Sequence, residues 1–302
     1  ALDEPTTLHF KMWPKLGGIL ACALLVQFSC FVECTKLPEP GTCGVDFADR
    51  IYGGTITKPK NYPWTALLVF SYGIYQDLYW CGGSLISDRY VMTAAHCVSD
   101  LSDEYKLEKI RLGEWDLASE DDCDEQTICN DPVIDVEVEK VIMHENYTEG
   151  TFLNDIALIK LKDAVTFSEF ALPLCLPTAD AVKDKNTDEL TYTAVGWGNT
   201  EHQNKTIQYG SRYKLHVQLN GVTNDDCGKV YDNIVPSKLC AGAEAGKDTC
   251  QGDSGGSLVA AVDGYSYAYG VVSYGKGCGR GGVPGVYTRV TSFLDWIDEH
   301  ME

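Results

Sequence analysis

Short apolar segments alternate with clusters of Gly, Pro, Asn and Asp along most of the chain. The segments are rich in β-branched and aromatic residues, which favour strands, and the clusters between them are typical of turns. Downstream of residue 35 the pattern therefore predicts an all-β fold, either a barrel or a sandwich. The clearest predicted strands are 65–70, 89–95, 155–161, 192–198 and 267–275.

One helix is predicted, near the carboxyl end. Phe293, Trp296, Ile297 and His300 recur at helical spacing, which places them on one face that can pack onto the body. The stretch 163–188 is richer in Pro and charged residues, so we place there the boundary between two halves of the fold.

A run of acidic residues, 120–131, predicts an exposed loop, because closely spaced like charges favour solvent.

The amino-terminal segment resembles a secretory signal. Lys15 precedes a mostly apolar run, 16–32, which is followed by small residues suited to signal-peptidase cleavage. We expect Met12 to be the true start, residues 1–11 to be an unassigned upstream segment and 12–34 to be the signal peptide. A membrane anchor is the alternative, although the run is short for a span and polar residues interrupt it.

Composition narrows the classes of function. The 302 residues include 24 basic and 44 acidic side chains, a formal net charge of −20. No basic stripe is available to displace counterions, so we expect no nucleic-acid partner and no stable membrane association. The chain has 13 cysteines, and three of them lie in the expected signal peptide. The remaining ten suit five disulfides in a secreted, extracellular protein.

Four short motifs follow one another along the chain. They are RIYGG at 50–54, TAAHC at 93–97, NDIAL at 154–158 and GDSGG at 252–256. Their order, with the cysteines beside them, resembles the trypsin and chymotrypsin family of serine peptidases from about Cys43 to the carboxyl end. The resemblance implies two six-stranded antiparallel β-barrels, an active site in the cleft between them and a C-terminal α-helix. It assigns residues 51–302 to the peptidase domain.

The chemistry of peptide cleavage explains three of these motif residues. A serine hydroxyl is a weak nucleophile at neutral pH, so it needs a base that takes its proton and passes it to the leaving amine. Histidine suits both transfers, and a carboxylate can hold its tautomer and stabilise the imidazolium. The resemblance implies Ser254 as nucleophile, His96 as base and Asp155 as orienting carboxylate. The alternative is a core histidine, a residue at a strand start and a turn serine.

The glycines of the GDSGG motif have an implied role too. Negative charge develops on the substrate carbonyl oxygen in the tetrahedral intermediate, and backbone N–H groups can stabilise it. By resemblance, Gly252 and Ser254 donate to this oxyanion. A simple turn would also explain the glycines.

Specificity is expected to rest on Asp248. By resemblance it forms the floor of the primary pocket, where a carboxylate pairs with an Arg or Lys side chain on the acyl side of the cut bond. A solvated loop acid is the alternative.

Phe152 is expected to crowd the neighbouring subsite and to favour small residues there. The other implied substrate-binding residues are Ser273, Tyr274 and Gly275 along the substrate backbone, with Gly275 and Gly285 keeping the pocket open. Tyr274 stands where the family often has Trp.

An activation switch is implied by RIYGG. Residues 35–50 would form a pro-segment, and cleavage after Arg50 would free the amino group of Ile51. In the family this group inserts beside the residue at Asp253, because a buried ammonium needs an opposing charge. The activator would be another trypsin-like protease or the protein itself, since Arg50 is basic.

The family pattern also implies the disulfides. They are Cys81 with Cys97, Cys227 with Cys240, Cys250 with Cys278 and Cys43 with Cys175, the last tethering the pro-segment. Cys123 and Cys129 remain and would close a small extra loop, a feature that resembles the catalytic domains of arthropod clip-domain peptidases. The short stretch before Arg50 leads us to expect no clip domain.

Two kinds of additional site are expected. Glu114 matches the start of a loop that binds calcium in some relatives, and Asp116 or the acids at 120–125 would complete the shell. Plain surface acidity is the alternative, and catalysis itself is expected to need no cofactor. Sequons at Asn146 and Asn204 predict glycosylation.

The expected protein is thus a secreted serine endopeptidase zymogen that cuts after Arg or Lys. The tethered pro-segment and the extra disulfide favour a step in an arthropod extracellular immune or developmental cascade. Its partners would be a protein substrate, an activating trypsin-like protease and a serpin-type inhibitor. A digestive trypsin is one alternative, and a catalytically silent relative that acts as a binding cofactor is another.

Overall fold

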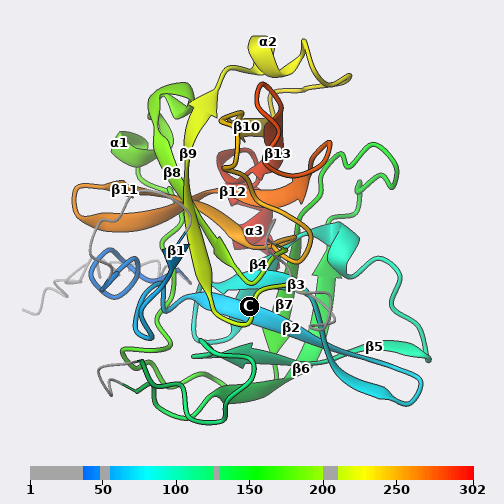
Figure 1. Cartoon of the computed structure of the whole chain (residues 1–302), viewed down its shortest axis with the longest axis vertical. Helices are drawn as coiled ribbons and strands as arrows, with labels where there is room; N and C mark the ends of the chain where they lie inside the picture. Colours follow the sequence, from blue (N-terminus) through cyan, green and yellow to red (C-terminus); the bar gives the residue numbers. More distant parts are fainter. Residues whose placement is uncertain (1–36, 48–54, 125–128, 200–209) are drawn as a thin grey trace, which may run out of the picture. The chain divides into compact units, whose positions relative to one another are not determined.

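The computed structural model describes residues 37–47, 55–124, 129–199 and 210–302 (Figure 1). Arg50, Ile51, Asn204 and the expected signal peptide lie outside these residues. Within them, the first half of the chain forms a closed antiparallel barrel of six strands. In barrel order its strands are β2 (Thr65–Tyr72), β3 (Tyr75–Leu85), β4 (Tyr90–Thr93), β7 (Ala157–Leu161), β6 (Ile134–Met143) and β5 (Tyr105–Leu112).

The second half forms another sheet, which closes because β8 pairs with β9 as well as with β11. Around this barrel the strands are β8 (Thr191–Gly196), β9 (Leu215–Val222), β10 (Lys238–Gly242), β13 (Pro284–Arg289), β12 (Tyr265–Tyr274) and β11 (Ser257–Val262). The short strand β1 (Thr55–Ile56) adds to β9. The predicted pair of six-stranded antiparallel barrels is therefore confirmed.

The predicted strands coincide with β2, β4, β7, β8 and β12, and the differences lie at their ends. The segment 89–95 stops being a strand at Thr93, and Ala95–Cys97 form the 3₁₀ helix η1 instead. The linker between the barrels contains α1 (Asp180–Lys183) and η2 (Thr187–Glu189). Two further short helices are α2 (Asn224–Cys227) and η3 (Val290–Ser292).

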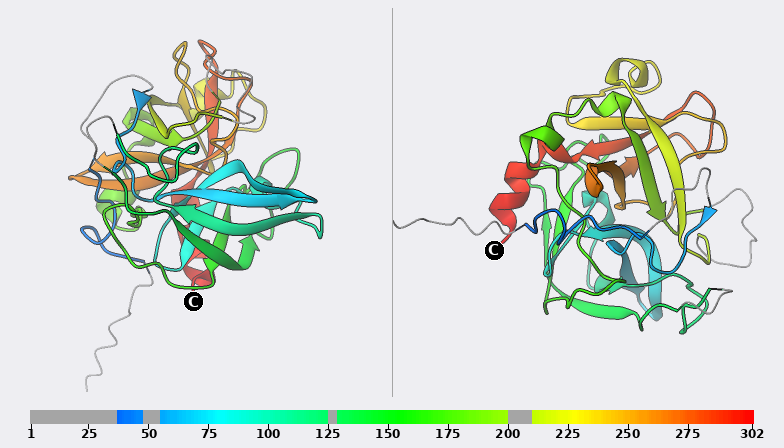
Figure 2. Two further views of the ribbon diagram at one scale, coloured as in Figure 1. Left: turned by 60° about the horizontal axis from the view of Figure 1, so that its bottom comes forward. Right: turned by 90° about the vertical axis from the view of Figure 1, so that its left-hand side faces the viewer.

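The C-terminal helix α3 (Leu294–His300) packs onto the core of the first barrel (Figure 2). Phe293 and Ile297 are buried there, as the periodicity predicts. Trp296 and His300 are only partly buried, because both side chains contact Glu145 at the surface. The packed face is completed by Leu294 and Met301.

The prediction that the acidic run is exposed is wrong for Asp122, whose exposed fraction is 4%. Its carboxylate accepts hydrogen bonds from the backbone N–H groups of Trp115 at 2.6 Å and Asp116 at 3.0 Å. These bonds offset the loss of hydration that would otherwise keep a carboxylate at the surface.

Within the described parts of the chain, none of the helices has both the length and the apolar character needed to cross a membrane.

Candidate active site

The candidate base and its orienting carboxylate lie together. His96 is in η1, directly after β4, and Asp155 lies two residues before β7, the strand that pairs with β4. The Asp155 Oδ2 atom lies 2.8 Å from His96 Nδ1, and Oδ1 accepts a 2.9 Å hydrogen bond from the backbone N–H of His96. Both carboxylate oxygens thus orient the same residue.

Asp155 is completely buried, yet it is well supplied with hydrogen bonds. Ser273, from β12 of the second barrel, donates its hydroxyl proton to Oδ2 at 2.5 Å. Thr288, from β13, donates to the Asp155 carbonyl oxygen at 2.7 Å. Because these donors come from the second barrel, Asp155 lies where the two barrels meet. Ser273, expected along the substrate backbone, has a side chain that bonds to this carboxylate.

Ser254 lies in the loop between β10 and β11. Its carbonyl oxygen accepts a 2.8 Å hydrogen bond from the N–H of Gly82 in β3, which ties this loop to the first barrel. Within the described residues, the Ser254 hydroxyl makes no hydrogen bond to His96, and the His96 Nε2 atom lies 3.7 Å from Sγ of Cys97.

Gly252, the expected oxyanion donor, has a φ of +102°. A residue with a β-carbon rarely adopts this conformation, so the backbone at this position favours glycine whatever the role of its N–H group.

Asp253 contacts the glycines of the GWG segment. Its Oδ1 accepts a 2.8 Å hydrogen bond from the N–H of Gly198, and Oδ2 accepts one of 2.9 Å from Cys250. A β-carbon at Gly196 or Gly198 would collide with the Asp253 carboxylate. Removal from bulk water raises the pKa of Asp253 to about 6, although both N–H groups act to lower it.

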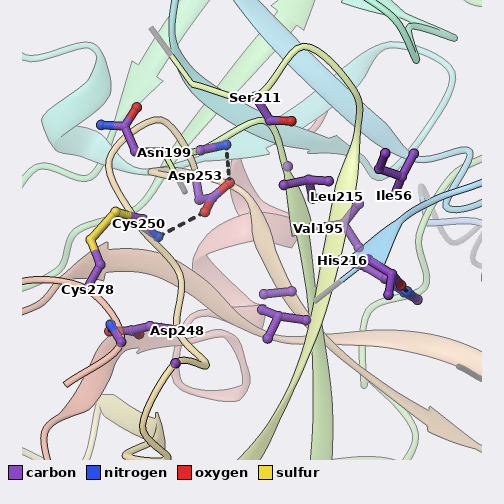
Figure 3. Close-up of a pocket in the computed structure, with 17 residues that line it drawn as sticks. Ile56, Val195, Asn199, Ser211, Leu215, His216, Asp248, Cys250, Asp253 and Cys278 are labelled. Carbon is purple, nitrogen blue, oxygen red and sulfur yellow. Dashed lines mark hydrogen bonds between the residues drawn. A yellow bond between two sulfur atoms is a disulfide. The ribbon is translucent and has the colours of Figure 1, made fainter. Parts of the chain in front are cut away.

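A cavity of about 600 Å³ connects Asp253 with Asp248 (Figure 3). The disulfide between Cys250 and Cys278 lies on the Asp248 side, whereas Ile56 and His216 lie on the other side. Asp248 accepts hydrogen bonds from the N–H groups of Thr249 at 2.9 Å and Gly279 at 3.1 Å, and burial raises its pKa.

Gly275 and Gly285, expected to keep the primary pocket open, are not among the residues that line this cavity. Gly285 instead faces Tyr287, whose hydroxyl a β-carbon there would approach to 2.9 Å. Gly275 follows the end of β12 and lies near Gly277.

Phe152 lies beside the candidate base, as expected. Its ring meets the His96 ring edge-on, with centroids 5.7 Å apart, and stacks on the Tyr274 ring at 5.2 Å. The two aromatic side chains therefore form one continuous wall next to His96.

Five disulfides are present in the described residues: four join the pairs that the family pattern implies, and the fifth joins the two remaining cysteines, Cys123 and Cys129. The five pairs are Cys43–Cys175, Cys81–Cys97, Cys123–Cys129, Cys227–Cys240 and Cys250–Cys278. Sequon residue Asn146 is exposed.

The acidic residues expected around a calcium ion differ in their burial and in their ion-pair partners. Both carboxylate oxygens of Asp116 lie 2.6 Å from the Arg212 guanidinium, so this residue is already neutralised. Glu114 and Asp122 are buried, and burial together with the Asp122 charge raises the pKa of Glu114 to about 7. In the described part of the chain, the buried Oδ1 atom of Asn130 accepts no hydrogen bond. Glu114, Asp122 and this amide oxygen are hard donors of the kind that calcium prefers. Glu114 is paired with Arg111 only at 3.4 Å, whereas Asp116 is held by Arg212 through both oxygens at 2.6 Å.

Comparison with known proteins agrees with this geometry. Residues 51–297 match the family model described as Trypsin. The chain belongs to the trypsin family. Among curated relatives within this family, it is 42% identical over 277 residues to CLIP domain-containing serine protease HP8 of Bombyx mori, covering 88% of this chain and 73% of the relative. It is 39% identical over 286 residues to Spaetzle-processing enzyme of Drosophila melanogaster, covering 88% and 70%.

A solved structure in the trypsin family shows the same fold. It is described as the Drosophila Grass clip serine protease of the Toll pathway and superimposes with a TM-score of 0.78 at 35% identity. The match covers 89% of this chain and 77% of that one. This chain is therefore a trypsin-like serine protease related to arthropod clip-domain proteases.

Three contributors to this trypsin-family site were missed by sequence reasoning. Gly198 supplies a backbone donor to Asp253, and Lys238 contacts Tyr274. Asn130 has a buried oxygen without a hydrogen bond in the described residues, and its amide nitrogen donates to the carbonyl of Gly113, the residue before Glu114. Gly198 belongs to the conspicuous GWG segment, so close packing could have been suspected there. The isolated Lys238 carried no comparable signal.

Proposed function

We propose that this protein is a secreted serine endopeptidase, made as a zymogen, that cleaves peptide bonds after Arg or Lys. The observation that carries the proposal is the buried carboxylate of Asp155 held against His96 Nδ1, on the barrel to which the Ser254 loop is tied. Nδ1 is committed to Asp155, so Nε2 is the ring nitrogen left to act as base.

The proposed reaction begins with the Ser254 hydroxyl. On activation its oxygen moves within hydrogen-bond distance of His96 Nε2, which takes the proton as the oxygen attacks the substrate carbonyl. Asp155 stabilises the resulting imidazolium. The N–H groups of Gly252 and Ser254 stabilise the oxyanion, and His96 then donates the proton to the leaving amine.

Substrate choice is proposed to depend on Asp248. Among the described residues, the partly buried carboxylate of Asp248 accepts hydrogen bonds from backbone N–H groups only, and no Lys or Arg forms an ion pair with it. The guanidinium of an entering Arg, or the ammonium of a Lys, would supply that cation and a charge-assisted hydrogen bond. Neutral side chains would leave the carboxylate without a partner charge.

Activation is proposed to follow cleavage after Arg50. The new ammonium group of Ile51 would enter the cavity and pair with Asp253, whose raised pKa reflects a poorly solvated carboxylate. Because Asp253 immediately precedes Ser254, this pairing would reorganise the nucleophile loop and the oxyanion donors together. A trypsin-like protease upstream, or this protein itself, would make the cut.

The biological setting that we propose is an arthropod extracellular cascade with immune or developmental output. The support is the similarity to clip-domain proteases, one of them named for processing Spaetzle and another for the Toll pathway, together with the extra Cys123–Cys129 loop. A specific protein substrate and a serpin-type inhibitor would be the partners. Calcium would be held by Glu114, Asp122 and Asn130, where it would neutralise buried charge and take no part in the reaction.

The test uses the full chain, purified uncleaved and then cleaved after Arg50 by trypsin, which is subsequently removed. We expect hydrolysis of arginine and lysine peptide substrates and labelling of Ser254 by an organophosphonate probe, both only after cleavage. The variant Ser254→Ala, treated identically, controls for residual trypsin. If cleaved wild-type protein neither hydrolyses nor labels, it is a catalytically silent cofactor. Rapid cleavage of many denatured proteins would favour a digestive role.

A further inference from the structure

Lys238 is a buried cation that the proposed reaction does not use. It begins β10, and its exposed fraction is only 4%. Within the described residues, its ammonium has no carboxylate within salt-bridge distance, and its hydrogen-bond partners are neutral oxygens. Burying a charge without a salt-bridge partner is costly even with the attraction of Asp155 and of the Tyr274 ring, whose centroid lies 4.5 Å from Nζ, so the position calls for an explanation beyond packing.

The contacts of the Lys238 ammonium join two walls of the site. Nζ donates a 2.8 Å hydrogen bond to the hydroxyl of Tyr274, at the end of β12. It also donates a 2.9 Å hydrogen bond to the carbonyl oxygen of Thr151, in the first-barrel loop that leads to Asp155. One ammonium therefore links both barrels beside the candidate base.

These contacts are coupled to His96 through aromatic rings. Tyr274 stacks on Phe152, the residue after Thr151, and Phe152 meets the His96 ring edge-on. Phe152 has a φ of +51°, an uncommon conformation for a residue with a β-carbon. The hydrogen bond to the preceding carbonyl holds the loop in the conformation that places this ring against Tyr274.

The partner hydroxyl exists because position 274 is Tyr. A Trp at this position, which the family often has, carries no hydroxyl to accept a hydrogen bond from Lys238. The hydrogen bond between Lys238 and Tyr274 therefore requires a tyrosine at this position.

We propose that Lys238 is a positioning residue that holds the rings of Phe152 and Tyr274 as one wall of the acyl-side substrate groove, and so determines selection of substrate residues upstream of the cleaved Arg or Lys. The inference rests on the proposed function. The wall would contact the residues of an extended peptide substrate that precede the cleaved Arg or Lys.

The test compares two substrates on the cleaved enzyme. Arginine ethyl ester reaches the primary pocket but not the wall, whereas acylated tetrapeptide amides ending in Arg span both. The variants are Lys238→Met, Tyr274→Phe and the double variant, with Lys229→Met as control because Lys229 is an exposed lysine near β10. Active-site titration normalises all rates to the amount of folded enzyme.

We expect Lys238→Met to lower kcat/KM for the tetrapeptides by about tenfold or more, mainly through KM, the size expected for a lost hydrogen bond to a charged group. Hydrolysis of the ester should change less than twofold, and Lys229→Met should match wild type on both substrates. Since the two residues act together, the double variant should lose no more than the worse single variant.

Several outcomes would overturn the inference. Equal loss on ester and tetrapeptide would indicate a general structural role, and additive losses in the double variant would show that the pair is not coupled. If Lys238→Met fails to fold, the test rests on Tyr274→Phe alone. In that case, an unchanged ratio of kcat/KM for the tetrapeptide to kcat/KM for the ester rejects the inference. An activated wild type that hydrolyses neither substrate would instead reject the proposed function, and this inference with it.

Discussion

Asp155 binds His96 through both carboxylate oxygens, one at the backbone N–H and one at Nδ1, 2.9 and 2.8 Å away. The first contact needs only an acceptor, but the second also selects the tautomer that leaves Nε2 free of a proton. A substitution that keeps the shape of the Asp155 side chain but removes its charge therefore tests whether the site needs only an acceptor that positions His96 or also the negative charge that selects its tautomer.

We expect Asp155→Asn to fold and to lower kcat by about 10⁴-fold at neutral pH, because an amide N–H facing Nδ1 stabilises the wrong tautomer. Steady-state assays of the cleaved variant with an arginine peptide substrate measure kcat. Asp163→Asn, the same change at an exposed carboxylate after β7, is a matched control. Activity of Asp155→Asn within tenfold of wild type would contradict the assigned role.

Asp248→Ser should reduce kcat/KM for arginine and lysine substrates by about 10⁴-fold, since a site built around a charge-assisted bond rejects ligands when that bond is lost. Substrates with neutral residues before the cut should change little. The variant Asp263→Ser removes an acid from the turn between β11 and β12, which does not line the cavity, and controls for net charge. Equal loss on basic and neutral substrates would show that Asp248 serves the fold rather than specificity.

Arg50→Gln should yield a secreted protein that never gains activity, because no amino group is released to pair with Asp253. Exposure to an upstream protease, followed by amino-terminal sequencing and a peptide assay, checks both the cut and its effect. Lys36→Gln removes the other basic residue of the expected pro-segment and should activate normally. Full activity of the uncleavable variant would reject the switch.

Lys214 offers a prediction about stability and pH. Its exposed fraction is 2%, and burial lowers its pKa from 10.5 to about 8. Below pH 8 the folded protein bears the full penalty of a poorly solvated ammonium. Between pH 8 and 10.5 the folded state sheds a proton that the unfolded chain keeps, so this penalty declines as pH rises.

Lys214→Met should therefore stabilise the protein at pH 7, by up to about 3 kcal/mol on the linkage relation. Thermal unfolding of the intact chain at pH 7 and pH 10 measures the effect, which should shrink at the higher pH. Lys229→Met, which removes an exposed lysine, should leave the melting temperature unchanged. A lower melting temperature for Lys214→Met at pH 7 would show that its contacts with Thr65 and Trp197 outweigh the penalty.

Calcium should raise the melting temperature of the wild type, because a ligand that binds only the folded state stabilises it. Glu114→Gln and Asn130→Ala should each weaken the rise, and chelation should reverse it. Asp116→Asn should leave the calcium-dependent increment intact, since Asp116 is occupied by Arg212. If calcium does not change the melting temperature of the wild type, the calcium proposal is wrong and Glu114 and Asp122 are buried acids without a metal.

Features encoded locally were predictable. The spacing of apolar residues located the interiors of strands such as β2 and β7, because a strand's pattern is visible within a few residues. The short motifs carried the family resemblance, and with it the two barrels, the pairing of cysteines as distant as Cys43 and Cys175, and the candidate base and nucleophile. The predicted strand 89–95 extended beyond the end of β4 at Thr93, and Trp296 is only partly buried, because tertiary packing decides where a local pattern stops.

Other properties arise only when distant segments meet. Asp122 looks like any surface acid until backbone N–H groups of Trp115 and Asp116 surround it, and Lys238 is an ordinary lysine until β12 and the Asp155 loop close over its ammonium. The free energy of a charged group depends on how many dipoles and charges surround it and how much water is excluded. Those quantities belong to the folded arrangement and are absent from the order of residues along the chain.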